Sequence, residues 1–317
     1  MAAVEFADVL EARERIGDRV NRTPMLASDS LSLRTGVRLS IKAESLQRTG
    51  AFKVRGALNA VSLLTDDQRR RGVVTFSAGN HGAGLAYAAY QLGAACTVFM
   101  AKGAVASKVE AIRGFGADVS MHPTIQDAFA AMEATVAESG VVFVSPFGDP
   151  AIVAGQGTVG LEILEDFPEV EQIIVPIGGG GLISGIATVM AERKPEVRII
   201  GVEPEGAPTM TLALEAGRPV RLETVATMAD GLAAPFTSEL NLDIVQRLVD
   251  DVVLVTEDEI ASAVRLAAQQ TKLVVEPASA AGLAALTTGK SAVPTGAPTV
   301  IIFTGGNIDF SLLKSLI

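Results

Sequence analysis

The 317-residue sequence has few of the residue types that build cross-links or metal centres. It contains one cysteine, Cys96, two histidines, His81 and His122, and no tryptophan. A single cysteine excludes an internal disulfide and a site made from several cysteines. Two histidines argue against a multi-histidine metal site. We therefore expect a reduced protein without a bound metal.

The sequence also lacks a basic block and a secretion signal. Lys and Arg number 26 against 36 Asp and Glu, so the net charge is −10, which argues against nucleic acid and anionic membranes as partners. The first residues, MAAVEFADVLEARERIG, are charged and amphipathic, unlike a signal peptide. We expect a cytoplasmic protein.

Two uncharged stretches, 72–101 (apart from His81) and 173–190, approach the length of a membrane span. Glycines and polar groups interrupt both, as SAGNHGAG in the first and PIGGGG in the second. Each stretch is better interpreted as a buried strand, a glycine-rich loop and a packed helix.

Short β-branched runs alternate with alanine-rich helical stretches along the chain, which predicts an α/β fold with open parallel sheets covered on both faces. We expect strands at 72–76, 95–100, 118–121, 141–144, 172–176, 198–203, 251–255 and 299–303. We expect helices at 4–16, 55–64, 82–92, 108–115, 125–139, 158–166, 182–194, 257–270 and 278–286. Thr256 and Glu259 have the spacing of a capping box. The length suggests about two domains, and no linker separates them.

The segment 173–185, IIVPIGGGGLISG, predicts a phosphate-binding loop. A buried strand leads into Gly178, Gly179, Gly180 and Gly181 and then into a helix. Glycines let backbone amides approach an anion, and the helix N-terminus adds free N–H groups. A bulky side chain at Gly179 is expected to enter the phosphate site. A plain tight turn is the alternative.

A second ligand fits the same loop less well. Gly179, Gly181 and Gly185 form a loose G-x-G-x-x-x-G, and Glu203 ends the next strand, which imitates a dinucleotide-binding unit. A nicotinamide-dependent oxidoreductase is therefore the alternative from another enzyme class. A binding protein without activity is the alternative outside enzymes.

Two further segments carry candidate chemistry. Lys53 lies among apolar neighbours just before a helix, and both features lower the pKa of an ammonium group. A neutral amine is what Schiff-base chemistry requires, although most lysines are ordinary surface residues. The segment 77–82, SAGNHG, follows a strand and opens a helix, so it is either a second anion-accepting turn or a plain connection.

These segments together carry a resemblance. QRTGAFKVRGA, SAGNHGAG, DPAIVAGQGT, PIGGGGL, GVEPEGA, ADGLA, VVEPASA and FTGGN follow one another between Gln47 and Asn307. In this order they resemble the fold type II pyridoxal-phosphate enzymes, specifically the threonine/serine dehydratase (ammonia-lyase) and serine racemase family. The resemblance implies a tryptophan-synthase-β-like fold with a large domain, 1–51 and 149–317, and a small domain, 52–148.

The resemblance also implies roles for individual residues. Lys53 would attach pyridoxal 5'-phosphate covalently, with Phe52 against the ring and Asn80 donating to the ring 3′-oxygen. Thr304 would meet the pyridine nitrogen, and a hydroxyl there does not force the ring to be protonated, which favours prompt β-elimination over transamination. The cofactor phosphate would lie on Gly178, Gly179, Gly180 and Gly181. The substrate carboxylate would be held by the backbone amides of Ser77, Ala78, Gly79, Asn80 and His81.

Two departures from the family pattern refine the expectation. Racemases of this family have a serine where this chain has Ala78, and alanine has no proton to supply, so dehydration is favoured over racemisation. The metal site of some relatives uses a Glu, a carbonyl and an Asp. Glu203 and Ala207 match, but Thr209 replaces the Asp, so no metal is expected.

The sequence therefore predicts a pyridoxal-phosphate-dependent ammonia-lyase acting on a β-hydroxy amino acid, most simply threonine or serine. A 3-hydroxyaspartate or phenylserine-like dehydratase and a serine racemase stay open as alternatives. The expected partner is a small-molecule amino acid, and the expected assembly is a homo-oligomer, either a dimer or a tetramer.

Overall fold

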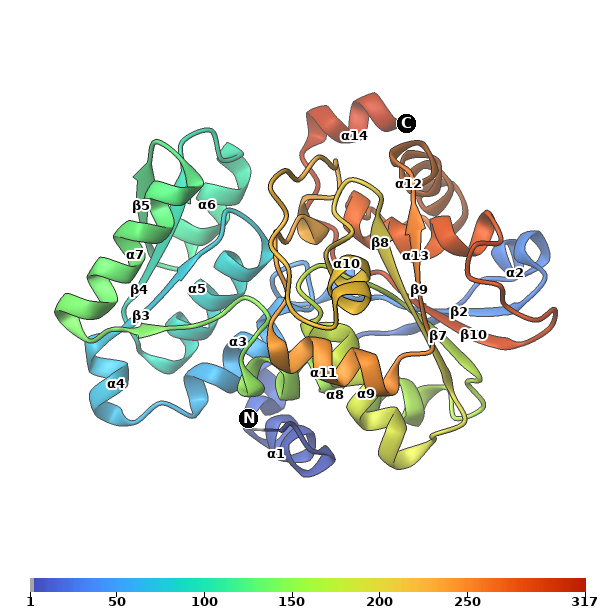
Figure 1. Cartoon of the computed structure of the whole chain (residues 1–317), viewed down its shortest axis with the longest axis horizontal. Coiled ribbons are helices and arrows are strands. Elements are labelled where there is room, and N and C mark those ends of the chain that lie inside the picture. Colours follow the sequence, from blue (N-terminus) through green and yellow to red (C-terminus); the bar gives the residue numbers. More distant parts are fainter. Residues whose placement is uncertain (1–2) are drawn as a thin grey trace.

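The computed structural model describes residues 3–317 and contains two β-sheets, each with helices packed against it (Figure 1). The chain builds the first strands of the large sheet, crosses to form the small sheet, and then returns to complete the large one. This confirms the predicted α/β class with two mainly parallel sheets. The exact domain boundaries at 51/52 and 148/149 stay a prediction.

The large sheet has the strand order β1 (Met25–Ala27), β2 (Arg38–Lys42), β10 (Pro298–Ile302), β7 (Gln172–Pro176), β8 (Arg198–Pro204) and β9 (Asp251–Val255). Its neighbouring strands are parallel except at the edge, where β1 pairs antiparallel with β2. Along β7, Ile173 and Val175 join the apolar cluster on one face and Ile174 joins the cluster on the other. Burial on both faces explains why this strand is continuously apolar.

The sequence analysis missed β1 and β2. β1 has only three residues, and β2 begins and ends with the charged residues Arg38 and Lys42. Neither therefore has the apolar run expected of a buried strand. Lys42 is nonetheless fully buried, because ion pairs rather than apolar contacts enclose it.

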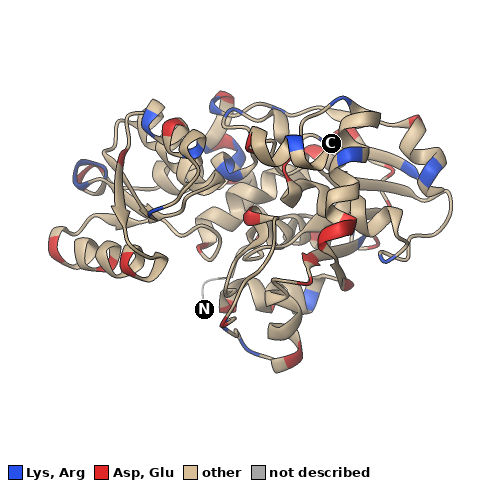
Figure 2. Ribbon diagram, turned by 90° about the horizontal axis from the view of Figure 1, so that it is seen from above, with Lys and Arg blue, Asp and Glu red and all other residues tan. Residues whose placement is uncertain are grey.

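The small sheet is entirely parallel, with the order β5 (Asp118–His122), β4 (Cys96–Ala101), β3 (Val73–Phe76) and β6 (Val142–Phe143). Basic and acidic residues occur on both parts of the molecule (Figure 2). No helix within residues 3–317 is both long enough and apolar enough to cross a bilayer.

Every helix expected from the sequence is present, and α7 and the capping box of Thr256 and Glu259 are as expected. α8 begins eight residues before its predicted start, because Asp149 caps it and Pro150 occupies its first turn. Helices α2, α4, α10, α11 and α14 were missed. The α-helices are α1 (Phe6–Ile16), α2 (Asp29–Thr35), α3 (Lys53–Ser62), α4 (Asp66–Arg71), α5 (Asn80–Leu92), α6 (Ala106–Gly114), α7 (Ile125–Ser139), α8 (Pro150–Asp166), α9 (Gly181–Arg193), α10 (Thr209–Ala216), α11 (Glu239–Leu248), α12 (Glu257–Thr271), α13 (Pro277–Thr287) and α14 (Phe310–Leu316).

Helix α3 lies between α5 of the small sheet and α8 of the large one, and glycines bring the three together. A Cβ added to Gly84 of α5 would lie 3.0 Å from the backbone nitrogen of Val54 in α3. A Cβ added to Gly155 of α8 would lie 2.6 Å from the Cα of Gly56. Real side chains do not tolerate such contacts, so these glycines allow the helix backbones to meet.

A buried ion cluster fixes the first turn of α3. Arg55 is fully buried and forms charge-assisted hydrogen bonds of 2.7–3.0 Å to the carboxylates of Glu44 and Glu162. Lys42 pairs with Glu162 at 2.6 Å. Burial alone would raise the pKa of Glu44, but Arg55 and its hydrogen bonds hold that pKa below the ordinary value. The cluster therefore ties β2, α3 and α8 together.

Replacing Arg55 by methionine should leave two buried carboxylates without their main partner. We expect the free energy of unfolding to fall by about 3–5 kcal/mol, measured by urea denaturation. The matched control is Arg247→Met in the exposed pair with Asp243, for which we expect a loss below about 1 kcal/mol. Equal losses in the two variants would contradict this account of the cluster.

Candidate active site

Lys53 is the first residue of α3, and its side chain turns toward the loop after β6. The Nζ atom donates a 2.8 Å hydrogen bond to the carbonyl of Pro146 and lies 5.1 Å from the ring centroid of Phe52. Burial lowers the pKa of Lys53 to about 8, against the opposing charge of Glu276. The predicted lowering of the lysine pKa is confirmed, and about a tenth of the amine is neutral at pH 7.

The glycine-rich loop lies between β7 and α9, as predicted. Gly180 has φ +92°, a conformation that favours glycine, and it caps α9, which begins at Gly181. The carbonyl of Gly179 accepts hydrogen bonds from Thr237 and from Asn241. The first N–H groups of α9 have no partner within the helix, so this loop can accept an anion.

The structure corrects the expectation for a side chain at Gly179. A Cβ there would lie 2.1 Å from the ring of Phe147, so it would collide with that ring rather than simply enter a phosphate site. The carbonyl oxygen of Phe147 would lie 3.0 Å from a Cβ added to Gly181. Because Pro146 accepts from Lys53, the segment Pro146–Phe147 joins the lysine to the glycine loop.

The SAGNHG segment forms the turn from β3 into α5. The amide of Ser77 donates to the carbonyl of Phe99 within the sheet, so in this structure that amide is not free for a substrate. Gly79 caps α5, and the first helical amides, beginning with Asn80, have no partner within the helix. Ala78 in the same turn carries no ionisable or hydroxyl group.

His81 belongs to the first turn of α5 and is 3% exposed. Burial lowers its pKa to about 3, with the charge of Lys53 acting in the same direction, so the imidazole is neutral. Its Nε2 lies 3.1 Å from the carbonyl of Val144 and therefore carries the proton. Its Nδ1 is buried without a hydrogen-bond partner.

Asn80 connects the small sheet to the large one through residues that the sequence analysis gave no role. Its Nδ2 donates to Glu276 at 2.7 Å, and its Oδ1 accepts from Asn307 at 2.8 Å. Asn307 also donates to the carbonyl of Thr49. These residues come from four segments of the resemblance, which the fold brings to one place.

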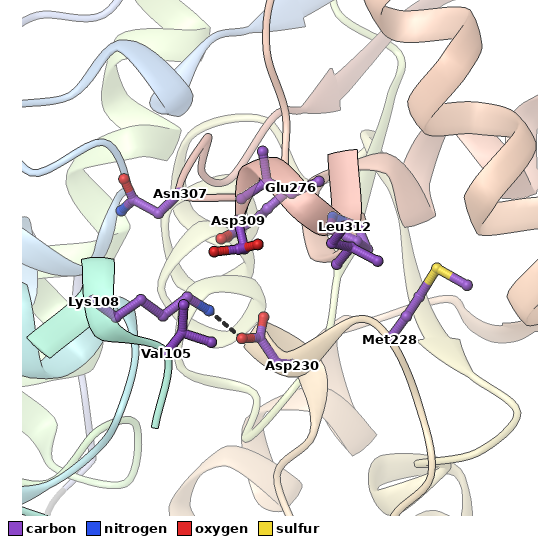
Figure 3. A pocket seen from close by; sticks show the side chains of 10 residues that line it. Val105, Lys108, Met228, Asp230, Glu276, Asn307, Asp309 and Leu312 are labelled. Carbon is purple, nitrogen blue, oxygen red and sulfur yellow. Dashed lines mark hydrogen bonds and ion pairs between the residues drawn. The ribbon is translucent and has the colours of Figure 1, made fainter. Parts of the chain in front are cut away.

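Glu276 lines a cavity of about 220 Å³ together with Lys108, Asp230 and Asn307 (Figure 3). Its Oε2 is buried and has no partner, and burial raises its pKa to about 8, helped by Asp230. Lys108 of α6 and Asp230 form an ion pair across this cavity. A neighbouring cavity of about 530 Å³ is open to the N-terminus of α5.

Thr304 follows β10 and is almost fully buried. Its carbonyl accepts from the amide of Phe52, which places it beside the residue before Lys53. Its Oγ1 lies 3.1 Å from the hydroxyl of Ser279 in α13. The sequence gave no signal for Ser279 beyond its place in VVEPASA.

The residues of the nicotinamide alternative do not form a ribose site. Glu203 is fully buried, and its two carboxylate oxygens accept from the amides of Met210 and Thr211 at the start of α10 and from the Thr211 hydroxyl. Burial raises its pKa. Glu203 therefore accepts hydrogen bonds from the N-terminus of α10. The hydroxyl of Thr209 donates a hydrogen bond to the carbonyl of Ala234.

The groups that remain suit a phosphorylated aldehyde. Lys53 has an amine, the glycine loop has backbone amides, and Thr304 has a buried hydroxyl. The predicted residues Lys53, Phe52, Asn80 and Thr304 are linked by hydrogen bonds or by adjacency through one set of loops. Pyridoxal phosphate has all three matching groups.

Comparison with known proteins supports this fit. The chain is 42% identical to the L-threonine ammonia-lyase of Thermotoga maritima, over 99% of this chain and 78% of that protein. It is also 42% identical to the catabolic L-threonine dehydratase of Escherichia coli, over 99% and 96%. The structure of maize serine racemase superimposes with a TM-score of 0.95 at 37% identity, covering 99% of this chain and 97% of that one. Residues 16–305 match the pyridoxal-phosphate dependent enzyme family, and the chain belongs to this family.

Proposed function

We propose that the protein is a pyridoxal-phosphate-dependent ammonia-lyase that converts threonine or serine into a 2-oxo acid and ammonia. The observation that carries the proposal is the position of Lys53, whose amine has a lowered pKa and is joined through Pro146–Phe147 to the glycine loop. The similarity to L-threonine ammonia-lyases along nearly the whole chain supports the substrate class.

The roles proposed for the site residues are those that the family resemblance implies. Lys53 attaches the cofactor, Phe52 lies against its ring, and Thr304 faces the pyridine nitrogen. Asn80 donates to the 3′-oxygen. Gly178, Gly179, Gly180 and Gly181 would hold the phosphate. The amides of Ala78, Gly79, Asn80 and His81 would hold the substrate carboxylate, without that of Ser77, which donates to Phe99.

The bound cofactor supplies an electron sink for the carbanion at Cα. With the cofactor bound, Lys53 would be the group that takes the Cα proton, because its lowered pKa keeps a usable fraction of the amine neutral. The β-hydroxyl leaves as water, and hydrolysis of the released enamine consumes one water, so the net products are a 2-oxo acid and ammonia. Because its pKa is about 3, the neutral imidazole of His81 is a weak base, and Lys53 remains as the base.

Racemisation is the second candidate, and the similarity to maize serine racemase favours considering it. It needs a proton donor on the face of the substrate opposite Lys53. Ala78 has none at the position where family racemases have serine. Dehydratases of 3-hydroxyaspartate or phenylserine-like substrates also stay open. The cytoplasmic location and the homo-oligomer, dimer or tetramer, stay predictions.

Replacing Lys53 by alanine should abolish both turnover and covalent cofactor attachment while the fold survives. Attachment is measured by borohydride reduction followed by mass spectrometry, and the fold by circular dichroism. The matched control is Lys102→Ala, because Lys102 is exposed and outside the site. Cofactor that borohydride still fixes to the Lys53→Ala protein would contradict the assignment.

The reactivity of Lys53 should follow its lowered pKa. Because that pKa is about 8, the neutral amine rises roughly tenfold between pH 7 and pH 9. Acetylation of Lys53 in cofactor-free protein should therefore accelerate over that range and level off above it. An ordinary lysine accelerates up to about pH 10.4. We would measure the rate by mass spectrometry of the peptide, with Lys102 as the internal reference.

Reaction choice should depend on Ala78. L-Serine should give pyruvate and ammonia with little D-serine, because positioned acid catalysis is worth roughly 10²–10⁴-fold and the side chain of Ala78 supplies no proton to the second face. Ala78→Ser should raise the racemised share, measured by chiral chromatography. If the unmodified protein forms D-serine as fast as pyruvate, another residue serves that face, and the assignment as a dehydratase without racemase activity is wrong.

A further inference from the structure

Ser279, in the first turn of α13, is fully buried and surrounded by the loop that carries Thr304. Its Oγ accepts a 2.6 Å hydrogen bond from the amide of Gly305 and donates a 2.5 Å hydrogen bond to the carbonyl of the same residue. A third contact, of 3.1 Å, reaches the Oγ1 of Thr304. Ser279 has no role in the mechanism above.

The single hydrogen of the Ser279 hydroxyl determines whether Ser279 donates a hydrogen bond to Thr304 or accepts one from it. A serine hydroxyl has one hydrogen and two lone pairs. The hydrogen is used on the carbonyl of Gly305, and one lone pair receives the amide of Gly305. Only one lone pair is left. In this arrangement Thr304 must donate to Ser279, and the oxygen of Thr304 then presents lone pairs alone to its other neighbours.

That arrangement does not suit a pyridine nitrogen without a proton. Such a nitrogen is an acceptor, so the hydroxyl that faces it must donate. Thr304 can donate to the ring only if its own hydrogen leaves Ser279. Two oxygen atoms would then face each other at 3.1 Å with no hydrogen between them, unless Ser279 supplies one. A turn of the Ser279 hydroxyl from Gly305 to Thr304 supplies it. The carbonyl of Gly305, which also accepts from the amide of Glu276, must then move away from the Ser279 oxygen, because no hydrogen lies between the two oxygens any longer.

We propose that Ser279 is a positioning residue that reverses its hydrogen bond when pyridoxal phosphate binds. Its hydroxyl then donates to Thr304, and Thr304 donates to the ring nitrogen. No covalent bond forms or breaks, and both hydrogens stay on their own oxygens. Each bond of such a chain polarises the next, so Ser279 strengthens Thr304 as a donor. The proposal rests on the proposed function, because that function places Thr304 at the ring nitrogen.

A double-mutant cycle on cofactor affinity tests the proposal. The variants are Ser279→Ala, Thr304→Val and the double variant, and cofactor-free protein is titrated with pyridoxal phosphate by absorbance. One supporting hydrogen bond is worth about five- to tenfold in the dissociation constant, so Ser279→Ala should weaken binding by about that factor. In the Thr304→Val background the same change should have little effect, since Ser279 acts through Thr304.

Two outcomes of the cycle overturn the proposal. If the two losses multiply, Ser279 supports the loop only through Gly305, which is a structural role. If either single variant binds the cofactor as well as the unmodified protein, the chain from Ser279 to the ring does not exist. The matched control is Ser291→Ala, a buried serine bonded to Ala285, which should leave the affinity unchanged.

The ring nitrogen itself provides a second measurement. With cofactor labelled with ¹⁵N at the ring, the chemical shift should be that of an unprotonated nitrogen that accepts a hydrogen bond, and it should move toward the free value in Ser279→Ala. A protonated ring in the unmodified protein would show that Thr304 still accepts, which overturns the proposal. Failure of the unmodified protein to attach the cofactor at Lys53 would instead refute the proposed function.

Discussion

The ion cluster around Arg55 is the constraint on which the site depends. Arg55 and Lys42 bring two positive charges into the interior, and Glu44 and Glu162 bring two negative ones, so the cluster is balanced. Arg55 lies two residues after Lys53 on the same turn of α3. Because burying a charge without a partner is costly, the four side chains must stay paired. The pairing fixes the position of Arg55 and, through the shared helical turn, the position of Lys53.

Small residues extend the same constraint to the small sheet. Gly84 brings α5 against the backbone at Lys53 and Val54, so the helix that carries Asn80 has a fixed distance from the lysine. Gly155 does the same for α8 on the other side. Lys53 is therefore positioned at once by elements of both sheets. Asn80, held by Glu276 and Asn307, closes the connection from the opposite end of the site.

The sequence was sufficient to predict an element where the residues of one continuous segment formed the whole pattern. β7 and β9 have the predicted bounds, because each is a run of β-branched residues between polar ends. The glycine loop and Lys53 were likewise recognised from local pattern. β2 was missed because its last residue, Lys42, is enclosed by partners distant in sequence. Helix α10 was missed for a related reason, since its N-terminus is satisfied by Glu203 of a neighbouring strand.

The same limit explains the errors at the site. Glu203 ends a strand after a glycine-rich loop, and only the fold shows that its carboxylate is occupied by α10. Gly179 was correctly placed in a loop, but its contact with Phe147 depends on a residue 32 positions earlier in the chain. Ser279 contacts Thr304 only because α13 packs beside the end of β10. No local pattern contains such pairs.

Burial is the largest cause of the shifted pKa values of two groups in the site, Lys53 and Glu276. Burial disfavours the charged form of each, so it lowers the pKa of Lys53 to about 8 and raises that of Glu276 to about 8. Each group also favours the charged form of the other. Asp230 raises the pKa of Glu276 further, whereas Lys108 and the hydrogen bond from Asn80 lower it. The Oε2 of Glu276 is buried without a hydrogen-bond partner, so the neutral carboxyl can carry its proton there. A neutral Glu276 still accepts from Asn80 through Oε1, so the hydrogen bond between the sheets survives the change of charge.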